Sequence, residues 1–382
     1  MSAPRSAGER WSRRKTPLGK PQTDGVSSDT FVRRVPPTVD DIAAYAARRE
    51  AAAKRAEAVS PRSAASLLHR IELRRFAGPV AYLEQISHLR IAHLTDQHVG
   101  RVTPMEVQRT AIAMTNAEKP DLVLLTGDFV CHSQLYLDEL TDLMRGIDAP
   151  AIAVLGNHDH WSGADEVQHA LERGGVEVLR NRNTTITLRH ERLQVVGLDD
   201  AYTGHARRDE AVKGLRHDLP SIGMSHIAEE ADGLWRHGIP LVLSGHTHGG
   251  QVTLARLHEL AVGMIAGHKY VHGLYGSRRG SDPKGESNGS SGANGKTRSS
   301  EPNGAVYVGA GIGAAVVPLR LGDRGPREVT IFELGCEPGD FVEHHSEQEP
   351  LRGRKPTKAQ MAKRAAAVIR KRLSRERKRL RA

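Results

Sequence analysis

The chain has 382 residues, of which 38% are hydrophobic and 26% are charged. This balance is close to the average of globular proteins and excludes a wholly disordered chain. The longest apolar runs are of strand length, and none reaches the ~20 residues that span a bilayer, so we expect no transmembrane helix. Two cysteines, Cys131 and Cys336, cannot form a disulfide framework, which fits a reducing compartment.

The positive charge lies at the two ends of the chain, whose formal net charge is +10. Residues 352–382 contain 14 Lys and Arg against one acid, a net charge of +13, and residues 1–35 contain eight against three, a net charge of +5. The residues between these ends therefore carry a net charge of −8. A surface that favours nucleic acid or an anionic membrane is expected at the tails rather than on a folded domain.

Residues 1–65 are expected to precede the folded domain. Residues 1–37 are rich in Ser, Pro, Gly and Arg and predict a disordered basic arm. The pair Arg13–Arg14 resembles a twin-arginine export motif, but the apolar stretch of roughly 7–15 residues that such a signal needs does not follow. Residues 38–65 predict an Ala-rich helix and linker, with Thr38 as a candidate cap.

From about residue 66 the sequence alternates between short apolar runs and helix signals. Thr103–Glu106 reads as a capping box, and residues 162–175 combine an acidic first turn with a glycine stop. Strands that alternate with helices predict a layered α/β domain over residues 66–335. Within it, the Gly/Ser/Asn-rich residues 277–304 predict a flexible insertion. The strand-like runs are 71–76, 90–95, 121–126, 151–155, 193–198, 221–225, 241–244, 305–309 and 328–334.

Residues 336–382 predict an acidic linker followed by a basic helical tail. In the tail, Met361, Ala365, Ile369 and Leu373 can share one helical face, and Lys and Arg cover the rest. Such a helix can lie on anionic lipid with its apolar face inward. A solvated charged tail and a nucleic-acid contact through phosphates are the alternatives.

Five of the apolar runs end in residues of metal-ligand type. Each motif alone is compatible with a turn, a helix cap or an ordinary loop histidine. Sites in open α/β sheets gather outside the carboxyl ends of the strands, so together these motifs are expected to meet at one edge. In chain order they are Asp96-Gln97-His98, Gly127-Asp128, Gly156-Asn157-His158-Asp159, Ser225-His226 and Gly245-His246-Thr247-His248-Gly249-Gly250.

This donor set predicts a pair of transition-metal ions. Imidazole, carboxylate and carboxamide ligands suit Mn, Fe or Zn better than Ca or Mg. Seven ligating residues are too many for one tetrahedral ion and suit two ions that share a carboxylate. Ions about 3.5–4 Å apart polarise phosphoryl oxygens and deprotonate a bridging water. The pattern therefore predicts a phosphoester hydrolase whose nucleophile is a metal-bridging hydroxide.

The motif set Asp-x-His, Gly-Asp, Gly-Asn-His-Asp, a lone His and Gly-His-Thr-His-Gly-Gly-Gln resembles the calcineurin-like metallophosphoesterase superfamily. The segment Gly245–Gln251, together with Gly309–Gly313 and Pro318–Arg320, is similar to its bacterial branch of membrane-associated phosphoesterases. The resemblance covers roughly residues 70–334. It implies a four-layer α-β-β-α sandwich of two mixed β-sheets.

The resemblance also implies a role for each site residue. His158 would contact the phosphate and stabilise or protonate the leaving oxygen, and Asp159 would orient His158 through a hydrogen bond. Seven residues would be metal ligands. The first ion would be held by Asp96, His98 and His248, and the second by Asn157, His226 and His246. Asp128 would bridge the two ions.

The chain departs from the family pattern beside this site. Cys131 stands where the family often has Asp, and a thiol is a weaker hydrogen-bond acceptor; a small buried residue is the alternative interpretation. Gln97 stands where an apolar residue is usual. Neither departure removes a ligand. Other histidines have other expected roles, with His93 in the core and His132 and His160 in loops that flank the site.

The sequence leaves the substrate open. A phosphodiesterase or pyrophosphatase acting on a lipid-linked or nucleotide-sugar substrate is the leading hypothesis, because some similar enzymes cleave the pyrophosphate of UDP-2,3-diacylglucosamine. A nuclease or nucleotide phosphodiesterase could use the same site. A non-catalytic scaffold of the same fold is the alternative from another class. The expected location is the cytoplasm, with a peripheral position on the inner membrane face if the tail binds lipid.

Overall fold

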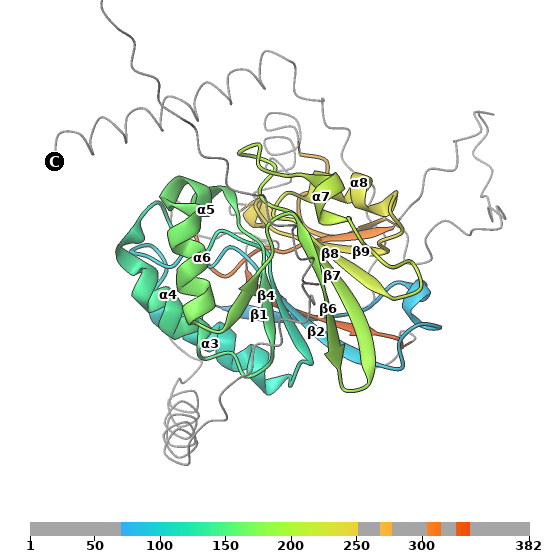
Figure 1. Ribbon diagram of the computed structural model, residues 1–382. Helices are drawn as coiled ribbons and strands as arrows, with labels where there is room; N and C mark the ends of the chain where they lie inside the picture. The colour runs from blue at the N-terminus through green and yellow to red at the C-terminus, as the bar shows by residue number, and fades with distance from the viewer. Residues whose placement is uncertain (1–69, 251–267, 277–303, 315–325, 337–382) are drawn as a thin grey trace, which may run out of the picture. The chain divides into compact units, whose positions relative to one another are not determined.

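The computed structural model describes residues 70–250, 268–276, 304–314 and 326–336 (Figure 1). The predicted basic arm, the Ala-rich helix, nearly all of the predicted insertion and the basic tail lie outside the described residues.

The described strands form two mixed sheets of six strands each. The first sheet has the order β1-β12-β2-β3-β4-β5, and the second has the order β10-β11-β9-β8-β7-β6. In the first sheet, neighbouring strands run parallel from β2 through β3 and β4 to β5. In the second sheet, neighbouring strands run parallel from β7 through β8 and β9 to β11. The strands are β1 (Ile71–Ala77), β2 (Leu89–Leu94), β3 (Leu122–Leu125), β4 (Ala151–Ala153), β5 (Val176–Val178), β6 (Arg182–Leu188), β7 (Glu191–Gly197), β8 (Ser221–Met224), β9 (Leu241–Ser244), β10 (Gly273–Gly276), β11 (Ala305–Val308) and β12 (Arg327–Leu334).

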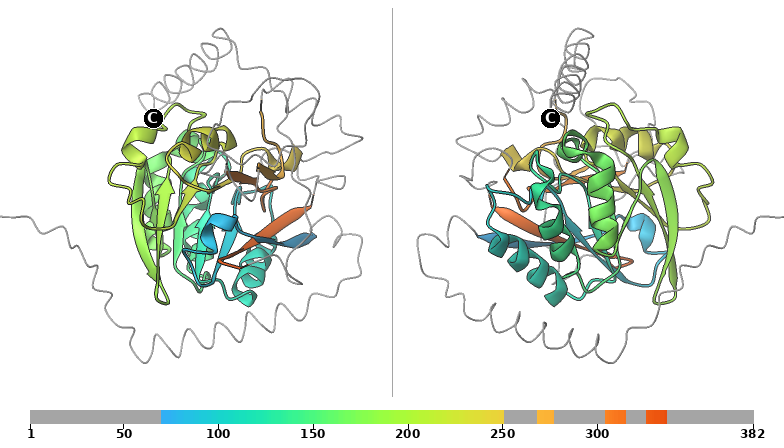
Figure 2. Two further views of the ribbon diagram at one scale, coloured as in Figure 1. Left: turned by 90° about the vertical axis from the view of Figure 1, so that its right-hand side faces the viewer. Right: turned by 60° about the vertical axis from the view of Figure 1, so that its left-hand side comes forward.

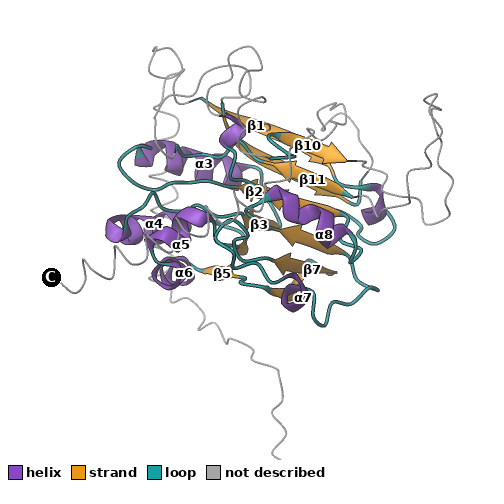
Figure 3. Cartoon of the chain, turned by 90° about the horizontal axis from the view of Figure 1, so that it is seen from above, coloured by secondary structure: helices purple, strands orange, loops and turns teal. Residues whose placement is uncertain are grey.

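Helices cover the outer faces of both sheets. In Figure 3 the helices α3 to α6 lie on one side of the strands and α7 and α8 lie on the other, and the turned views of Figure 2 show the same separation. The predicted four-layer sandwich is therefore confirmed. The helices are α3 (Met105–Ala117), α4 (Leu137–Met144), α5 (Asn157–Ser162), α6 (Ala164–Arg173), α7 (Arg208–Ala211) and α8 (Ala231–Trp235), with short 3-10 helices at η1 (Val80–Tyr82), η2 (Gln134–Tyr136), η3 (Ala228–Glu230) and η4 (His248–Gly250).

Three apolar clusters hold these layers together. One packs α3, α4 and α6 against the first sheet, one fills the space between the sheets, and one packs α8 against the second sheet. In the central cluster, the ring centroid of Phe76 lies 5.2 Å from that of Tyr307 and 5.6 Å from that of Phe332. Aromatic pairs of this kind contribute about 0.5–1.5 kcal/mol beyond their buried area. The central core fixes the two sheets face to face.

The strand-like runs of the sequence all become strands, but one helix start was predicted wrongly. The side chain of Thr103 does not cap α3; its Oγ1 accepts a hydrogen bond from the backbone N–H of Ala314 at 3.0 Å. Pro104 takes the cap position instead, with no side-chain cap. The Thr103 hydroxyl thus bonds a backbone group about two hundred residues away instead of capping the helix that follows it.

Among the described residues, no helix has both the length and the apolar character needed to cross a membrane.

Candidate metal centre

The loops that follow five strands converge between the two sheets. Loops after β2, β3 and β4 come from the first sheet, and loops after β8 and β9 come from the second. Five of the seven predicted ligands have a backbone φ in the left-handed region: Asp96 (51°), His98 (45°), Asp128 (58°), His246 (76°) and His248 (53°). Non-glycine residues adopt this conformation rarely, and such strain concentrates at functional sites. Local backbone strain therefore accompanies the orientation of these side chains toward one another.

The first group of donors contains Asp96, His98, Asp128 and His248. One ligand atom from each lies within 4.8 Å of the others, and all four residues are buried. His98 Nε2 lies 3.0 Å from His248 Nε2 and 3.5 Å from Asp128 Oδ2. His248 Nε2 lies 3.3 Å from Asp96 Oδ1. These are the four residues expected to hold the first ion.

The second group contains Asp128, His226 and His246. His226 Nε2 lies 3.3 Å from Asp128 Oδ2 and 3.3 Å from His246 Nδ1. Asp128 thus belongs to both groups, as a bridging ligand must. Asn157 begins α5 directly after β4 and is 2% exposed, which leaves its carboxamide inside the domain.

Unpartnered buried oxygens indicate that these donors suit cations. Asp96 Oδ1 and Asn157 Oδ1 are buried without a hydrogen-bond partner among the described residues. Leaving such an acceptor unpaired costs about 1–3 kcal/mol, and more if it is charged. Both oxygens belong to predicted ligands, one for each ion, and a cation would satisfy them. The residues present therefore fit the metal pair that the motifs predict.

The charges of the centre influence each other strongly. Burial, together with the negative charge of Asp128, raises the pKa of Asp96 above its usual range. Burial alone would lower the pKa of His226, but the carboxylates of Asp128, Asp96 and Asp200 raise it to about 10. Burial and the nearby imidazoles hold the pKa of His246 well below its usual range, so His246 keeps a lone pair at neutral pH. This mixture of carboxylates and neutral imidazole is the donor set of a transition-metal site.

Hydrogen bonds orient several of the ligands. The carbonyl oxygen of Thr126 lies 2.7 Å from His226 Nδ1, so this nitrogen donates a hydrogen bond to it and Nε2 is left facing Asp128. Asp96 Oδ2 accepts hydrogen bonds from Thr95 Oγ1 at 2.8 Å and from the backbone N–H of His246 at 3.1 Å. These contacts link the two sheets through the ligands themselves.

Two glycines allow the loops to approach closely. A Cβ on Gly156 would overlap the carboxylate of Asp128, and a Cβ on Gly245 would overlap the side chains of Thr95 and Asp96. Each glycine directly precedes a predicted ligand, Asn157 or His246 in turn. The glycines of both motifs are thus needed for space beside a ligand.

Asp159 does not orient His158, and the predicted hydrogen bond between them is wrong. The carboxylate of Asp159 accepts hydrogen bonds from the backbone N–H groups of Asp128 (2.9 Å), Phe129 (2.8 Å), Val130 (3.3 Å) and Gly156 (2.9 Å). Four donors fill its oxygens, while His158 Nδ1 has no hydrogen-bond partner among the described residues. Asp159 therefore holds the loop that presents Asp128 rather than the imidazole next to it in sequence.

His158 lies at the rim of the centre among other rings. Its Nε2 is 3.9 Å from Asp128 Oδ2, and its ring centroid lies 4.1 Å from that of His132 and 4.9 Å from that of Trp161. Its backbone N–H donates to Asp128 Oδ1 at 2.8 Å. This position places the imidazole beside the predicted metal pair while leaving it outside both donor groups.

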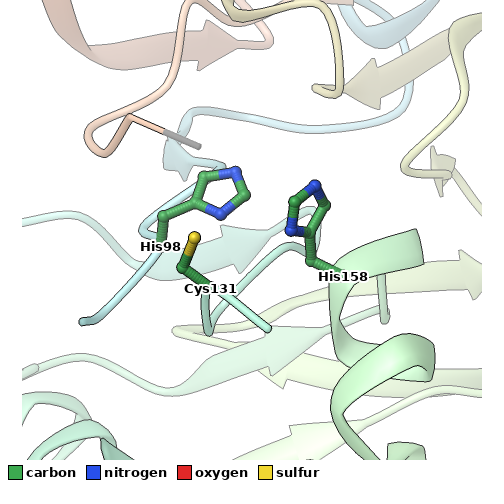
Figure 4. Close-up of side chains that lie close together, drawn as sticks. All are labelled: His98, Cys131 and His158. Carbon is green, nitrogen blue, oxygen red and sulfur yellow. The ribbon is translucent and has the colours of Figure 1, made fainter. Parts of the chain in front are cut away.

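One sequence expectation for other residues is met, and two are corrected. His93 is 1% exposed and lies 2.8 Å from Thr126 Oγ1, as expected of a core residue. His160 was expected in a loop but lies on α5, where its Nε2 is 2.6 Å from Asp199 Oδ1. Cys131 is only partly buried, so it is not a small core residue; it lies beside His98 and His158 (Figure 4). Gln97 is buried with neither side-chain polar atom paired within the described part of the chain.

Several rim residues were not predicted from the sequence. Trp161 lies within 6.0 Å, centroid to centroid, of Tyr202, and Tyr202 lies 5.2 Å from His246. Asp199 bonds both His160 and Arg180. Trp161 follows the Gly-Asn-His-Asp motif by two residues, which was the available hint.

Comparisons with known proteins agree with the geometry. Residues 89–250 match the family described as calcineurin-like phosphoesterase. The chain is 28% identical over 251 residues to the uncharacterized metallophosphoesterase YkuE of Bacillus subtilis, a match that covers 64% of this chain and 78% of the relative. It is 29% identical over 199 residues to the phosphodiesterase YaeI of Escherichia coli, covering 50% of this chain and 72% of the relative.

The fold, the converging donors and these matches define the class of protein. Over residues 89–250 the chain is similar to the calcineurin-like phosphoesterase family, as it is to the two relatives above. It is a metal-dependent phosphoesterase, a hydrolase of phosphoester bonds.

Proposed function

We propose that the protein hydrolyses phosphodiester or pyrophosphate bonds with the help of two transition-metal cations, Mn, Fe or Zn. The observation that carries the proposal is the position of Asp128. Its carboxylate belongs to two separate groups of donors, each with its ligand atoms within 4.8 Å of one another. A shared carboxylate between two such groups is the arrangement that a pair of ions 3.5–4 Å apart requires.

The seven ligands would divide as the motifs predict. Two bound cations would polarise the phosphoryl oxygens and lower the pKa of a water molecule between them, which supplies the nucleophile for in-line attack. Asp96, His98 and His248 would hold one cation, with Asp128 shared. Asn157, His226 and His246 would hold the other. Asp159 would keep the Asp128 loop in place through its four backbone hydrogen bonds.

His158 would act on the substrate. Burial lowers the pKa of this imidazole below its usual range, although the nearby Asp128 opposes the change. A neutral imidazole donates one N–H, and Nε2 is the nitrogen on the Asp128 side. From there it can donate to a phosphoryl oxygen or to the leaving oxygen as negative charge develops.

The rim favours a substrate that carries an organic group next to the phosphate. The ring centroids of His132 and Trp161 lie 4.1 Å and 4.9 Å from that of His158. The ring centroid of Tyr202 lies 5.2 Å from that of His246. Such surfaces can pack against a nucleoside or against the sugar of a nucleotide sugar. A nucleotide-sugar or lipid-linked pyrophosphate therefore remains our leading substrate class. A nuclease is the second candidate, because the same rings can stack on a base.

A substrate panel tests the proposal. Hydrolysis of bis(p-nitrophenyl) phosphate should rise with Mn²⁺ and disappear with a chelator, and turnover of nucleotide sugars should exceed that of phosphomonoesters and DNA. No hydrolysis of any diester by Mn²⁺-loaded protein would contradict the proposed reaction. Faster turnover of DNA than of nucleotide sugars would favour the nuclease.

We propose that the basic tail binds an anionic membrane surface, which would place the protein at the inner membrane face. The support is compositional: a net charge of +13 over residues 352–382, with apolar residues at helical spacing. Each Lys or Arg near an anionic surface contributes about 1 kcal/mol, so a tail of this charge can bind measurably. A lipid-bound tail would bring the site to a lipid-linked pyrophosphate.

A further inference from the structure

The thiol of Cys131 lies beside two imidazoles of the candidate metal centre. Figure 4 shows His98 and His158 with the ring nitrogen next to the Cβ, Nδ1, on the side of the sulfur. One ring nitrogen from each histidine and the sulfur of Cys131 lie within 4.8 Å of one another. His98 Nδ1 and His158 Nδ1 are buried and have no hydrogen-bond partner among the described residues. Three donor atoms thus surround one small volume.

This volume differs from the volumes assigned to the metal pair. His98 uses Nε2 to approach His248 and Asp128, at 3.0 Å and 3.5 Å. His158 likewise presents Nε2 to Asp128, at 3.9 Å. The Nε2 edges therefore face the pair, and the Nδ1 edges face the thiol.

We propose that His98 Nδ1, Cys131 Sγ and His158 Nδ1 form a third, inhibitory cation site for a thiophilic divalent ion of the zinc class. One thiolate and two imidazoles are a donor set that Zn²⁺ accepts, and Mn²⁺ has little preference for sulfur. On binding, the S–H bond breaks, the sulfur bonds the metal, and the proton leaves to water. The inhibitory role rests on the function proposed above, whereas binding to the site does not.

The solvent side of the site offers an entry route and a fourth ligand. His132 is exposed, and its Nδ1 lies 3.7 Å from the sulfur of Cys131. Its ring also lies 4.1 Å from that of His158. A zinc-class ion takes four ligands in a tetrahedral arrangement, so either His132 or a water molecule can complete the set.

Occupancy of this site should stop catalysis because of the chemistry of His98. A neutral imidazole has one N–H and one lone pair. An ion on Nδ1 therefore leaves the proton on Nε2, the nitrogen that the metal pair needs. His98 can serve the pair or the thiol site, but as a neutral ring it cannot serve both.

Cadmium titration of the metal-free full-length protein tests the site directly. Cd²⁺ bound to a thiolate gives an ultraviolet charge-transfer band, and the seven proposed ligands of the pair contain no sulfur. We expect the band to saturate at one equivalent in the wild type and in the matched control Cys336→Ser, and to be lost in both Cys131→Ser and Cys131→Ala. Absence of the band in the wild type, or its survival in the Cys131 variants, would overturn the proposal.

Zinc inhibition of Mn²⁺-supported diester hydrolysis tests the inhibitory role. Each variant is compared with its own uninhibited rate. The zinc concentration for half-inhibition should rise at least about tenfold in Cys131→Ser and Cys131→Asp and stay unchanged in Cys336→Ser. Equal inhibition of the wild type and Cys131→Ser would place the zinc ion in the metal pair and defeat the inhibitory role. An inactive wild type would count against the proposed function, and the cadmium band would still decide the site.

Discussion

His158 is the residue whose removal should separate catalysis from metal binding. It lies beside Asp128 but belongs to neither donor group of the pair. We expect His158→Ala to lower kcat about 10²- to 10⁴-fold, because positioned proton donors contribute that much. Its content of tightly bound metal should equal that of the wild type. The matched control is His169→Ala, an exposed histidine on α6, which should change neither quantity.

Steady-state kinetics with metal analysis by mass spectrometry would check this prediction. A His158→Ala variant that keeps wild-type turnover would remove the substrate role of this imidazole. A variant that loses bound metal would make His158 a ligand instead.

Asp159 acts through its hydrogen bonds to the backbone of the loop that presents Asp128. An Asn at this position keeps one acceptor oxygen and places an NH₂ against backbone N–H donors. We expect Asp159→Asn to lower the free energy of unfolding by about 1–3 kcal/mol and to weaken metal binding about 10- to 100-fold. Asp165→Asn is the control, because the Asp165 side chain is 81% exposed and such surface pairs contribute little.

Denaturant unfolding of the metal-free protein, followed by metal titration, would measure both effects. Unchanged metal affinity in Asp159→Asn would show that the Asp128 loop does not need this carboxylate.

At the residue scale, ligand identity could be predicted from the motifs and hydrogen-bond partners could not. Asp96, His98 and Asp128 follow strands in a recognisable pattern, so their meeting could be expected. Three of the four partners of Asp159 are backbone N–H groups about thirty positions away, and backbone groups leave no mark in a sequence. The proximity of Cys131 to His98 could not be predicted either, because the two side chains come from loops after different strands.

At the scale of elements, β12 of the first sheet contributes a buried carboxylate that bonds to groups on or beside strands of the second sheet. Glu328 lies 2.9 Å from His272 Nε2, accepts a hydrogen bond from Tyr307 at 2.7 Å and from the backbone N–H of Ala310 at 2.9 Å. Burial alone would raise the pKa of Glu328, but His272, Arg74 and the Tyr307 hydroxyl lower it to about 2. The ionised form is therefore favoured by folding.

This lowered pKa predicts acid sensitivity. A carboxyl whose pKa is lower in the folded state stabilises the protein above its unfolded pKa, about 4.3, and loses that contribution as the pH falls toward about 2. Between about pH 5 and pH 3, the wild type should lose about 2 kcal/mol more stability than Glu328→Gln. Denaturant unfolding at both pH values measures the difference. An equal loss in both proteins would show that Glu328 titrates normally.

Elements with strong apolar runs could be predicted, whereas short or edge elements could not. β3 reads Leu122–Leu125, which is apolar throughout because both of its faces are covered. β6, from Arg182 to Leu188, lies at the edge of the second sheet and is mostly polar, so it was not among the strand-like runs. The cap expected from Thr103 failed because its hydroxyl bonds a distant loop.

At the scale of the whole molecule, the basic tail is the part whose partner can be tested most simply. We expect the full-length protein to sediment with vesicles that contain anionic lipid, and a chain without residues 352–382 to stay in solution. The attraction should weaken with salt, because it depends on charge. Equal sedimentation of both forms would reject the lipid proposal, and salt-sensitive binding to DNA alone would favour nucleic acid.

The arrangement of two sheets came from the family resemblance and not from the pattern of runs. Alternating strands and helices predicted an α/β domain, but they did not show that β2, β3 and β4 belong to one sheet and β8 and β9 to another. The expected single edge is instead a meeting of loops from both sheets. His226 and His246 reach Asp128 only because the central core holds the sheets face to face.

The most direct test is a count of bound metal ions. The full-length chain is loaded with Mn²⁺, free metal is removed, and the ions that stay bound show whether these loops form a binuclear centre. Two ions per chain are expected for the wild type, and Asp128→Asn should lose both together because its carboxylate is shared. Fewer than one ion per wild-type chain would contradict the metal pair and the hydrolysis derived from it.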